Sequence, residues 1–218
     1  KRVRVFHENN QGLTRSLIKG CELARGHLIA RQDAGDISEP TRLEEQKSLL
    51  DEYSDCSFVS CWTVMTGPGG EYLYTSKGAG LGKIPRDLLH CSPSGIYGLL
   101  DGPTHHGSVM FRKSAYQRVG GYRPAFYYGQ DWDLWYRLAE SGKFGMVQKS
   151  LLHASLRPTS ISFLKRAQQQ EYAALSARSF QLRMRGLSDD EPLRAAMELK
   201  WCEEEHKRNR VDTQPYTE

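Results

Sequence analysis

The sequence lacks a long hydrophobic run. Nowhere in its 218 residues do the roughly 18 consecutive apolar residues of a membrane-spanning helix occur, and no signal-peptide pattern opens the chain. Its five cysteines are an odd number and form no Cys-x-x-Cys pair, so neither a disulfide framework nor a zinc site is predicted. We therefore expect buried or incidental thiols in a cytoplasmic protein without a transmembrane segment.

A cluster of positive charge is also missing. The formal net charge is only +4, and no group of Lys and Arg residues with interleaved aromatic residues occurs, so nucleic acid is not an expected partner. The surplus lies in residues 1–162, with 20 basic against 16 acidic residues, whereas residues 163–218 carry 10 of each. A surplus near the candidate chemistry favours an anionic ligand.

The first part of the chain does have alternating strand and helix patterns. Residues 1–6, "KRVRVF", alternate in the manner of a strand, apolar spacing predicts a helix over 13–24, and "LIA" at 28–30 is the next predicted strand. A strand, a helix and a strand within about 30 residues predict a parallel βαβ unit and an α/β sheet. Because the chain opens in a strand pattern without Met, we expect it to enter the protein partway through.

Further elements follow from periodicity and turn residues. Ser38 is a candidate N-cap for a helix that runs to about Asp55. Residues 76–104 are rich in Gly, Pro and Ser and predict a loop region of the kind that often forms a lid or a binding segment. The remaining predicted elements are a hairpin of strands at 57–66 and 71–76, a strand at 107–111, a short helix from Ser114, and a helix from Gln130 that ends at Gly142.

From residue 163 onward the pattern changes to helices. Gly186 ends one helical pattern, and residues 188–191, "SDDE", form a capping box that opens a second. We therefore divide the chain into a sheet domain at 1–162 and a helical extension at 163–218. The extension is expected to pack on the sheet domain or on a protein partner. Peripheral binding at the inner face of a membrane is less favoured, because the charges of the extension balance.

Two aspartates follow the predicted strand at 28–30, in the segment "RQDAGD". Ligands of open α/β sheets bind beyond the carboxyl ends of strands, and two carboxylates there can hold a hard divalent cation such as Mg2+ or Mn2+. The alternative is structural: Asp33 closes a turn, Gly35 supplies a permissive backbone, and Asp36 or Ser38 caps the next helix. Spacing alone favours the structural alternative.

Asp131, in "YYGQDWDLWYRL", is the second candidate. The dipole and the free N–H groups of a helix start keep an aspartate ionised, so Asp131 could accept a proton as a general base. The alternative is again an N-cap. Trp132 and Trp135 could stack on a sugar ring or fill the core, and the core is the commoner place.

Two histidines and an arginine complete the candidates. His105 and His106 precede the strand predicted at 107–111, where successive side chains point to opposite faces, so at most one of them is expected to act. A zinc site is not supported. Arg157, in "LLHASLRPTSIS", could neutralise a phosphate or could be a solvated loop residue.

These segments, in this order, resemble the family 2 glycosyltransferases, which are nucleotide-sugar-dependent enzymes of the GT-A fold. The segment "ENNQGLTRSLIKGCELARGHLIARQDAGDISEPTRLEEQ" resembles the part with the family's DxD-type motif. The segment "HHGSVMFRKSAYQRVGGYRPAFYYGQDWDLWYRLAESG" resembles the acceptor-side part, and "LLHASLRPTSIS" resembles the closing strand and loop. The resemblance covers most of residues 5–162 and implies a Rossmann-like mixed sheet flanked by helices.

The resemblance also implies roles for residues. Asp131 matches the catalytic base of an inverting transfer from a nucleotide-diphosphate sugar to an acceptor hydroxyl. Asp33 begins the acidic motif, whose third position, the common metal ligand, is Gly35 here. Either Asp36 takes over the binding of Mg2+ or Mn2+, or the ion binds weakly or through Asp33 alone. The implied contacts to the nucleotide diphosphate are Asp33, Asp36, Arg31 and Arg157, and those to the acceptor or sugar are His106, Trp132 and Trp135.

The chain departs from the family pattern in three places. The first strand, helix and second strand of the family have no counterpart, so at least one βαβ unit of roughly 30 residues is expected to be absent. Ile18 stands where the family often has Asn, and Ser155-Leu156-Arg157 where it often has Arg-x-His. These departures leave a second hypothesis, a non-catalytic nucleotide- or glycan-binding remnant that acts as an interaction module.

Overall fold

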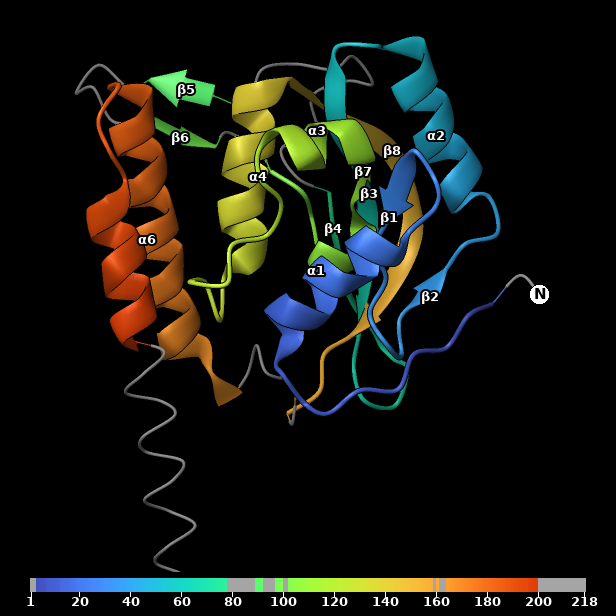
Figure 1. Ribbon diagram of the computed structural model, residues 1–218. Helices are drawn as coiled ribbons and strands as arrows, with labels where there is room; N and C mark the ends of the chain where they lie inside the picture. Colours follow the sequence, from blue (N-terminus) through green and yellow to red (C-terminus); the bar gives the residue numbers. More distant parts are fainter. Residues whose placement is uncertain are drawn as a thin grey trace, which may run out of the picture.

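A six-stranded mixed sheet lies between two layers of helices (Figure 1). The computed structural model describes residues 3–77, 89–91, 97–99, 102–158, 160 and 164–199. The strand order is β1, β7, β3, β8, β2. Strand β7 pairs with the first half of β3 and β4 with its last residues. The bounds are β1 Leu28–Ala30, β2 Ile37–Ser38, β3 Cys56–Thr66, β4 Tyr72–Ser76, β7 Met110–Arg112 and β8 Lys143–Ser155.

Strand direction determines which chain ends meet. The two longest strands, β3 and β8, pair in parallel, while β7 is antiparallel to both β3 and β1. Strands β1, β3 and β8 therefore run the same way. Their carboxyl ends lie at one edge of the sheet, together with the segment that enters β7, and this is where ligands of open α/β sheets bind.

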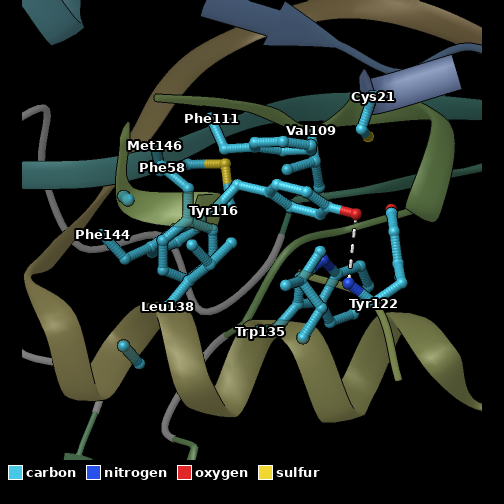
Figure 2. Packing of buried hydrophobic residues seen from close by; sticks show 13 residues of the cluster. Cys21, Phe58, Val109, Phe111, Tyr116, Tyr122, Trp135, Leu138, Phe144 and Met146 are labelled. Atoms are coloured by element: carbon cyan, nitrogen blue, oxygen red, sulfur yellow. Dashed lines mark hydrogen bonds between the residues drawn. The ribbon is translucent and has the colours of Figure 1, made fainter. Parts of the chain in front are cut away.

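Alternate residues of the central strands pack on opposite faces of the sheet. Helices α1, α3 and α4 cover one face, where the buried residues of the strands and of the position just before β7 are Phe58, Val109, Phe111, Phe144 and Met146 (Figure 2). Helix α2 covers the other face, where they are Cys56, Val59, Cys61, Met110, Val147, Leu151 and Leu152. The helix bounds are α1 Leu13–Leu23, α2 Arg42–Glu52, α3 Lys113–Arg118 and α4 Gln130–Ser141.

The predicted opening strand is wrong. Residues 3–12 form no strand, and Val3, Val5 and Phe6 are exposed. A short alternating segment does not make a strand without a neighbour that supplies a hydrogen-bond ladder and an apolar surface. The predicted parallel βαβ unit is therefore wrong too, because β1 pairs antiparallel with β7.

Two other boundaries differ from the prediction. Ser38 belongs to β2, which pairs with β8, and α2 begins later with Thr41 as its N-cap. The region 76–104 is not wholly a loop, since β5 (Leu89–Cys91) and β6 (Tyr97–Leu99) form a separate two-stranded sheet. The rest of the prediction for 78–88, 92–96 and 100–101 lies outside the described residues.

The helical extension packs against the sheet domain, as predicted. Helix α6 (Arg166–Met184) runs beside α4, and residues 190–199 form a second helix next to it (Figure 1). Gly186 has a φ of 68°, which ends the first helix. The Ser188 hydroxyl accepts a hydrogen bond from the Asp190 N–H at 3.1 Å, which caps the second helix. Phe126, Tyr172 and Ala196 form the buried contact between the two parts.

The predicted state of the cysteines is confirmed where the structure describes them. Cys21, Cys56 and Cys61 are buried free thiols. Burial raises the pKa of Cys56 to about 12 and those of Cys21 and Cys61 to about 11, so none is a nucleophile at neutral pH. Among the described residues no helix has the length and apolar character that crossing a bilayer requires.

Candidate functional site

A cavity of about 760 Å³ opens at the edge of the sheet where β1, β3 and β8 end. The segment after β1, the segment before β7, the first turn of α4, the residues after β8 and one residue of α6, Gln169, form its walls. All eight site residues that the sequence predicts line this cavity: Arg31, Asp33, Asp36, His106, Asp131, Trp132, Trp135 and Arg157. Residues from distant parts of the sequence therefore meet in one place.

The segment "RQDAGD" is a tight turn whose carboxylates converge. Gly35 has a φ of 93°, and the Asp36 N–H donates to the Asp33 carbonyl at 3.2 Å. The structural alternative is thus right about the turn and wrong about the cap, because Thr41 holds the N-cap position of α2. Both aspartates line the cavity.

Buried Arg42 of α2 forms hydrogen bonds with residues on both sides of this turn. Its guanidinium donates to the Arg31 carbonyl at 2.6 Å and to the Ser38 hydroxyl at 2.7 Å. Its Nε donates at 3.1 Å to Gln46, which in turn donates to the Ser108 carbonyl at 2.7 Å. Helix α2 therefore fixes the acidic turn and the segment before β7 with one hydrogen-bond chain, which sequence reasoning did not predict.

Arg31 and Asp33 form an ion pair at the cavity wall. Both terminal nitrogens of the guanidinium donate to the two carboxylate oxygens, and only 8% of the Arg31 side chain is exposed. A two-point pair of this kind is stronger than a single charged hydrogen bond. The arginine expected to contact a diphosphate thus holds an aspartate expected to contact a metal.

Asp36 lies deeper than Asp33 and lacks a hydrogen bond on one oxygen. Its side chain is 9% exposed, and its Oδ2 has no hydrogen-bond partner among the described residues. Burial, followed by the negative charge of Asp33, raises the pKa of Asp36 to about 6. The imidazole of His105 is close by, with its Nδ1 3.8 Å from that oxygen.

Asp33, Asp36 and His105 together offer ligand atoms within 4.8 Å of one another, a group that could hold a metal ion. Two carboxylate oxygens and an imidazole nitrogen suit a divalent transition ion. Burial lowers the pKa of His105, which keeps its imidazole neutral. Sequence reasoning missed His105 because it applied the side-chain alternation of a strand to the two histidines and expected at most one of them to act. They lie instead at the 3-10 helix η1 (His106–Ser108), before β7 begins at Met110, and both line the cavity.

Asp131 lies in the first turn of α4 and is not its N-cap. Gly129, with a φ of 63°, takes that position, so the N-cap alternative is wrong. The Asp131 Oδ1 accepts a hydrogen bond from the Trp132 N–H at 3.0 Å, and its Oδ2 lies 3.9 Å from His106 Nδ1. Burial raises the pKa of Asp131 despite these N–H contacts, so desolvation outweighs the predicted effect of the helix start.

The two tryptophans differ in exposure. Trp135 is 3% exposed and belongs to the core cluster, as the packing alternative expects, with one part at the cavity wall. Trp132 is 38% exposed. Its ring contacts that of Trp135 edge to face, with the ring centroids 5.2 Å apart. Trp132 therefore presents the more accessible aromatic surface. Arg157 also lines the cavity, where it is exposed and near Gly35.

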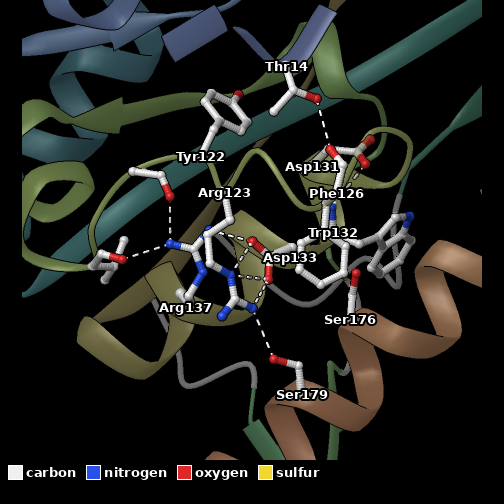
Figure 3. A network of polar contacts seen from close by, with 12 residues as sticks. Thr14, Tyr122, Arg123, Phe126, Asp131, Trp132, Asp133, Arg137, Ser176 and Ser179 are labelled. Atoms are coloured by element: carbon white, nitrogen blue, oxygen red, sulfur yellow. Dashed lines mark hydrogen bonds and ion pairs between the residues drawn. The ribbon is translucent and has the colours of Figure 1, made fainter. Parts of the chain in front are cut away.

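Asp133, two residues after Asp131, anchors α4 from inside (Figure 3). Its carboxylate is 1% exposed and pairs with Arg123 and Arg137. Arg123 also donates to Asp189 at 2.7 Å and to Ser179 of α6 at 2.9 Å, which connects α4 to the helical extension. Sequence reasoning did not assign this network, although the spacing of Asp133 and Arg137 is that of a helical ion pair.

Comparison with known proteins identifies the class. Residues 1–120 match the family described as Glycosyl transferase family 2, more than half of the chain, and the chain belongs to this family. A crystal structure of S. aureus TarS 1-349 is similar with a TM-score of 0.50 and 12% identity, over 97% of this chain and 74% of that chain. The predicted GT-A-like α/β fold is thereby confirmed.

Two curated relatives are similar in sequence. The chain is 30% identical over 166 residues to a Bacillus subtilis protein named as the glycosyltransferase EpsE, covering 75% of this chain and 55% of that protein. It is 28% identical over 138 residues to the UDP-Gal:alpha-D-GlcNAc-diphosphoundecaprenol beta-1,3-galactosyltransferase of Escherichia coli, covering 62% of this chain and 46% of that protein. The chain thus spans about half the length of these relatives.

Proposed function

We propose that the protein transfers a sugar from a nucleotide-diphosphate sugar to an acceptor hydroxyl by a single, inverting displacement. One observation supports this proposal best: a desolvated carboxylate, Asp131, and the acidic turn of Asp33 and Asp36 open on the same cavity. A transferase needs a proton acceptor beside the attacking hydroxyl and positive charge beside the departing diphosphate.

Asp131 is the proposed base. The acceptor oxygen attacks the anomeric carbon and its proton passes to the Asp131 carboxylate, while the bond from that carbon to the diphosphate oxygen breaks. A carboxylate with a pKa above its ordinary value holds this proton better than a solvated one. Trp132, the more exposed of the two tryptophans, is proposed to stack on the sugar or acceptor, with His106 and the edge of Trp135 beside it.

The leaving diphosphate is proposed to lie between the acidic turn and Arg157. Arg31 and Arg157 supply positive charge at this wall of the cavity. Asp33 and Asp36 are proposed to hold Mg2+ or Mn2+, and the oxygen donors present fit such an ion. When bound, the ion neutralises charge that develops on the diphosphate.

The donor is proposed to be a UDP-sugar and the acceptor a glycan. The support is the name of the Escherichia coli relative, which describes a UDP-linked donor and a glycan acceptor on a diphosphate lipid. A cytoplasmic location, with peripheral contact at the inner face of a membrane, belongs to the same proposal, because a lipid-linked acceptor lies at a membrane surface.

The test is sugar transfer by the full-length protein. Release of UDP from UDP-glucose, UDP-galactose and UDP-N-acetylglucosamine is measured with and without lipid-linked glycan acceptors, beside the Asp131→Asn variant. We expect acceptor-dependent release that falls about 100- to 10,000-fold in the variant. Nucleotide binding by calorimetry without any turnover would favour the interaction module instead.

A further inference from the structure

We propose that His105 is the third protein ligand of a divalent transition ion held by Asp33 and Asp36. This inference rests on the proposed diphosphate site and makes it specific, because two carboxylates alone do not distinguish Mg2+ from Mn2+, whereas an imidazole does.

One oxygen of the Asp36 carboxylate is buried without a hydrogen-bond partner among the described residues. A carboxylate oxygen that is buried without a hydrogen bond costs free energy. Native proteins offset this cost with another partner, such as a metal ion. The Asp36 side chain is more than nine-tenths buried, its Oδ2 has no hydrogen-bond partner among the described residues, and this oxygen points toward His105. A cation between the two groups would complete that carboxylate.

The three candidate ligand atoms lie close enough together to share one ion. Two ligand atoms that each lie about 2.1 Å from one ion are at most about 4.2 Å apart. His105 Nδ1 and Asp36 Oδ2 are 3.8 Å apart, and all three ligand atoms lie within 4.8 Å of one another. A small side-chain rotation therefore brings them to one ion.

The absence of a side chain at Gly107 leaves a gap beside Asp36 and His105. A Cβ atom at this position would lie 2.8 Å from Asp36 Oδ2 and 3.1 Å from His105 Nδ1. A side chain there would fill the gap between the proposed ligands. Gly107 also donates its N–H to His105 Nδ1 at 3.0 Å, so ligation through Nδ1 exchanges this hydrogen bond for a bond to the ion.

The Arg31–Asp33 pair adds a consequence. In the described arrangement Asp33 is held by Arg31, so an ion that binds Asp33 competes with this guanidinium. Asp36 Oδ2 has no such competitor among the described residues, and His105 Nδ1 gives up a hydrogen bond from the Gly107 N–H and not an ion pair. They are therefore expected to supply much of the affinity, and the released Arg31 would face the diphosphate.

The direct test is electron paramagnetic resonance of the full-length protein with MnCl2 alone and then with UDP. Pulsed spectra of bound Mn2+ are expected to show coupling to a 14N nucleus of a coordinated imidazole. In His105→Asn this coupling should disappear and the Mn2+ affinity should fall about tenfold or more, because even the loss of a residue that only supports a ligand costs 10- to 100-fold. Asn can still cap η1, so the variant is expected to fold.

Two further variants sharpen the result. His27→Gln removes an exposed imidazole that does not line the cavity and should leave coupling and affinity unchanged. Gly107→Ala keeps every ligand but fills the gap, and it should weaken Mn2+ binding. His105→Asn should also lower the preference for Mn2+ over Mg2+.

The outcomes separate this inference from the proposed function. Mn2+ binding without 14N coupling, unchanged in His105→Asn, would overturn the role of His105 and leave the two aspartates as the metal site. No Mn2+ binding with or without UDP would overturn the metal site altogether. Sugar transfer that persists in EDTA would then show that the proposed transfer stands without it.

Discussion

His106 lies between Asp131 and Tyr122. Its Nδ1 is 3.9 Å from the Asp131 Oδ2, and its Nε2 is 2.9 Å from the Tyr122 hydroxyl. Burial lowers the pKa of His106 well below its ordinary value, so the imidazole stays neutral and does not lower the pKa of Asp131 as a cation would. The proposed base therefore has a neutral, ordered neighbour.

The pH dependence of transfer should reflect this environment. Asp131 acts as a base only when it is deprotonated, and burial raises its pKa. We therefore expect kcat/KM to fall as the pH drops through a value above the ordinary carboxyl range. A pH profile of UDP release measures this limb. The residual rate of Asp131→Asn should lack it, and an unshifted limb would contradict a desolvated base.

Tyr122→Phe should reduce kcat more than it changes KM. The substitution removes the hydroxyl that contacts His106 and keeps the buried ring. Loss of one hydrogen bond is worth about 0.5 to 1.5 kcal/mol, which corresponds to about two- to tenfold in rate. Tyr136→Phe is the matched control, because Tyr136 stacks on Phe180 and does not line the cavity. Equal effects of the two variants would argue against a positioning role for Tyr122.

Much of the fold could be predicted from local patterns. The periodicity around Leu134 and Leu138 and the β-branched run before Thr66 specify α4 and β3, because their own apolar faces determine where they are buried. The direction of β1 could not be predicted, since it depends on pairing with β7, more than 75 residues away. A strand boundary such as Ser38 likewise depends on β8.

The site could be predicted in part for a similar reason. Asp33, Asp36 and Asp131 follow strands or open a helix, positions that a sequence pattern identifies. His105 could not be predicted, because its position depends on a 3-10 turn that brings both histidines to one cavity. Arg42 was missed because a buried arginine whose described contacts are neutral acceptors has no sequence signature.

Asp36→Asn should stabilise the metal-free protein at neutral pH. The folded pKa is raised from 3.8 to about 6, so the folded state binds this proton more tightly than the unfolded chain, and stability falls as the pH rises through that window. Such a change in the pKa of Asp36 corresponds to as much as about 3 kcal/mol of stability. Urea denaturation in EDTA at pH 7.5 measures the gain, and it should vanish below about pH 4. Asp33→Asn, which breaks the Arg31 pair, should instead destabilise.

Asp133→Asn should be strongly destabilising without changing the cavity wall. The carboxylate is 1% exposed between Arg123 and Arg137, so an amide deprives Arg137 of the carboxylate that it pairs with and leaves Arg123 with Asp189. Removal of one partner from a buried ion pair costs about 3 to 5 kcal/mol. Asp51→Asn is the matched control, because Asp51 and Lys47 form an exposed pair that contributes little to stability. Urea denaturation of both variants measures the difference.

Because Arg123 also holds Asp189 and Ser179, proteolysis should cut the helical extension first in Asp133→Asn. Equal stability of the two variants would show that Asp133 does not anchor α4 to the extension.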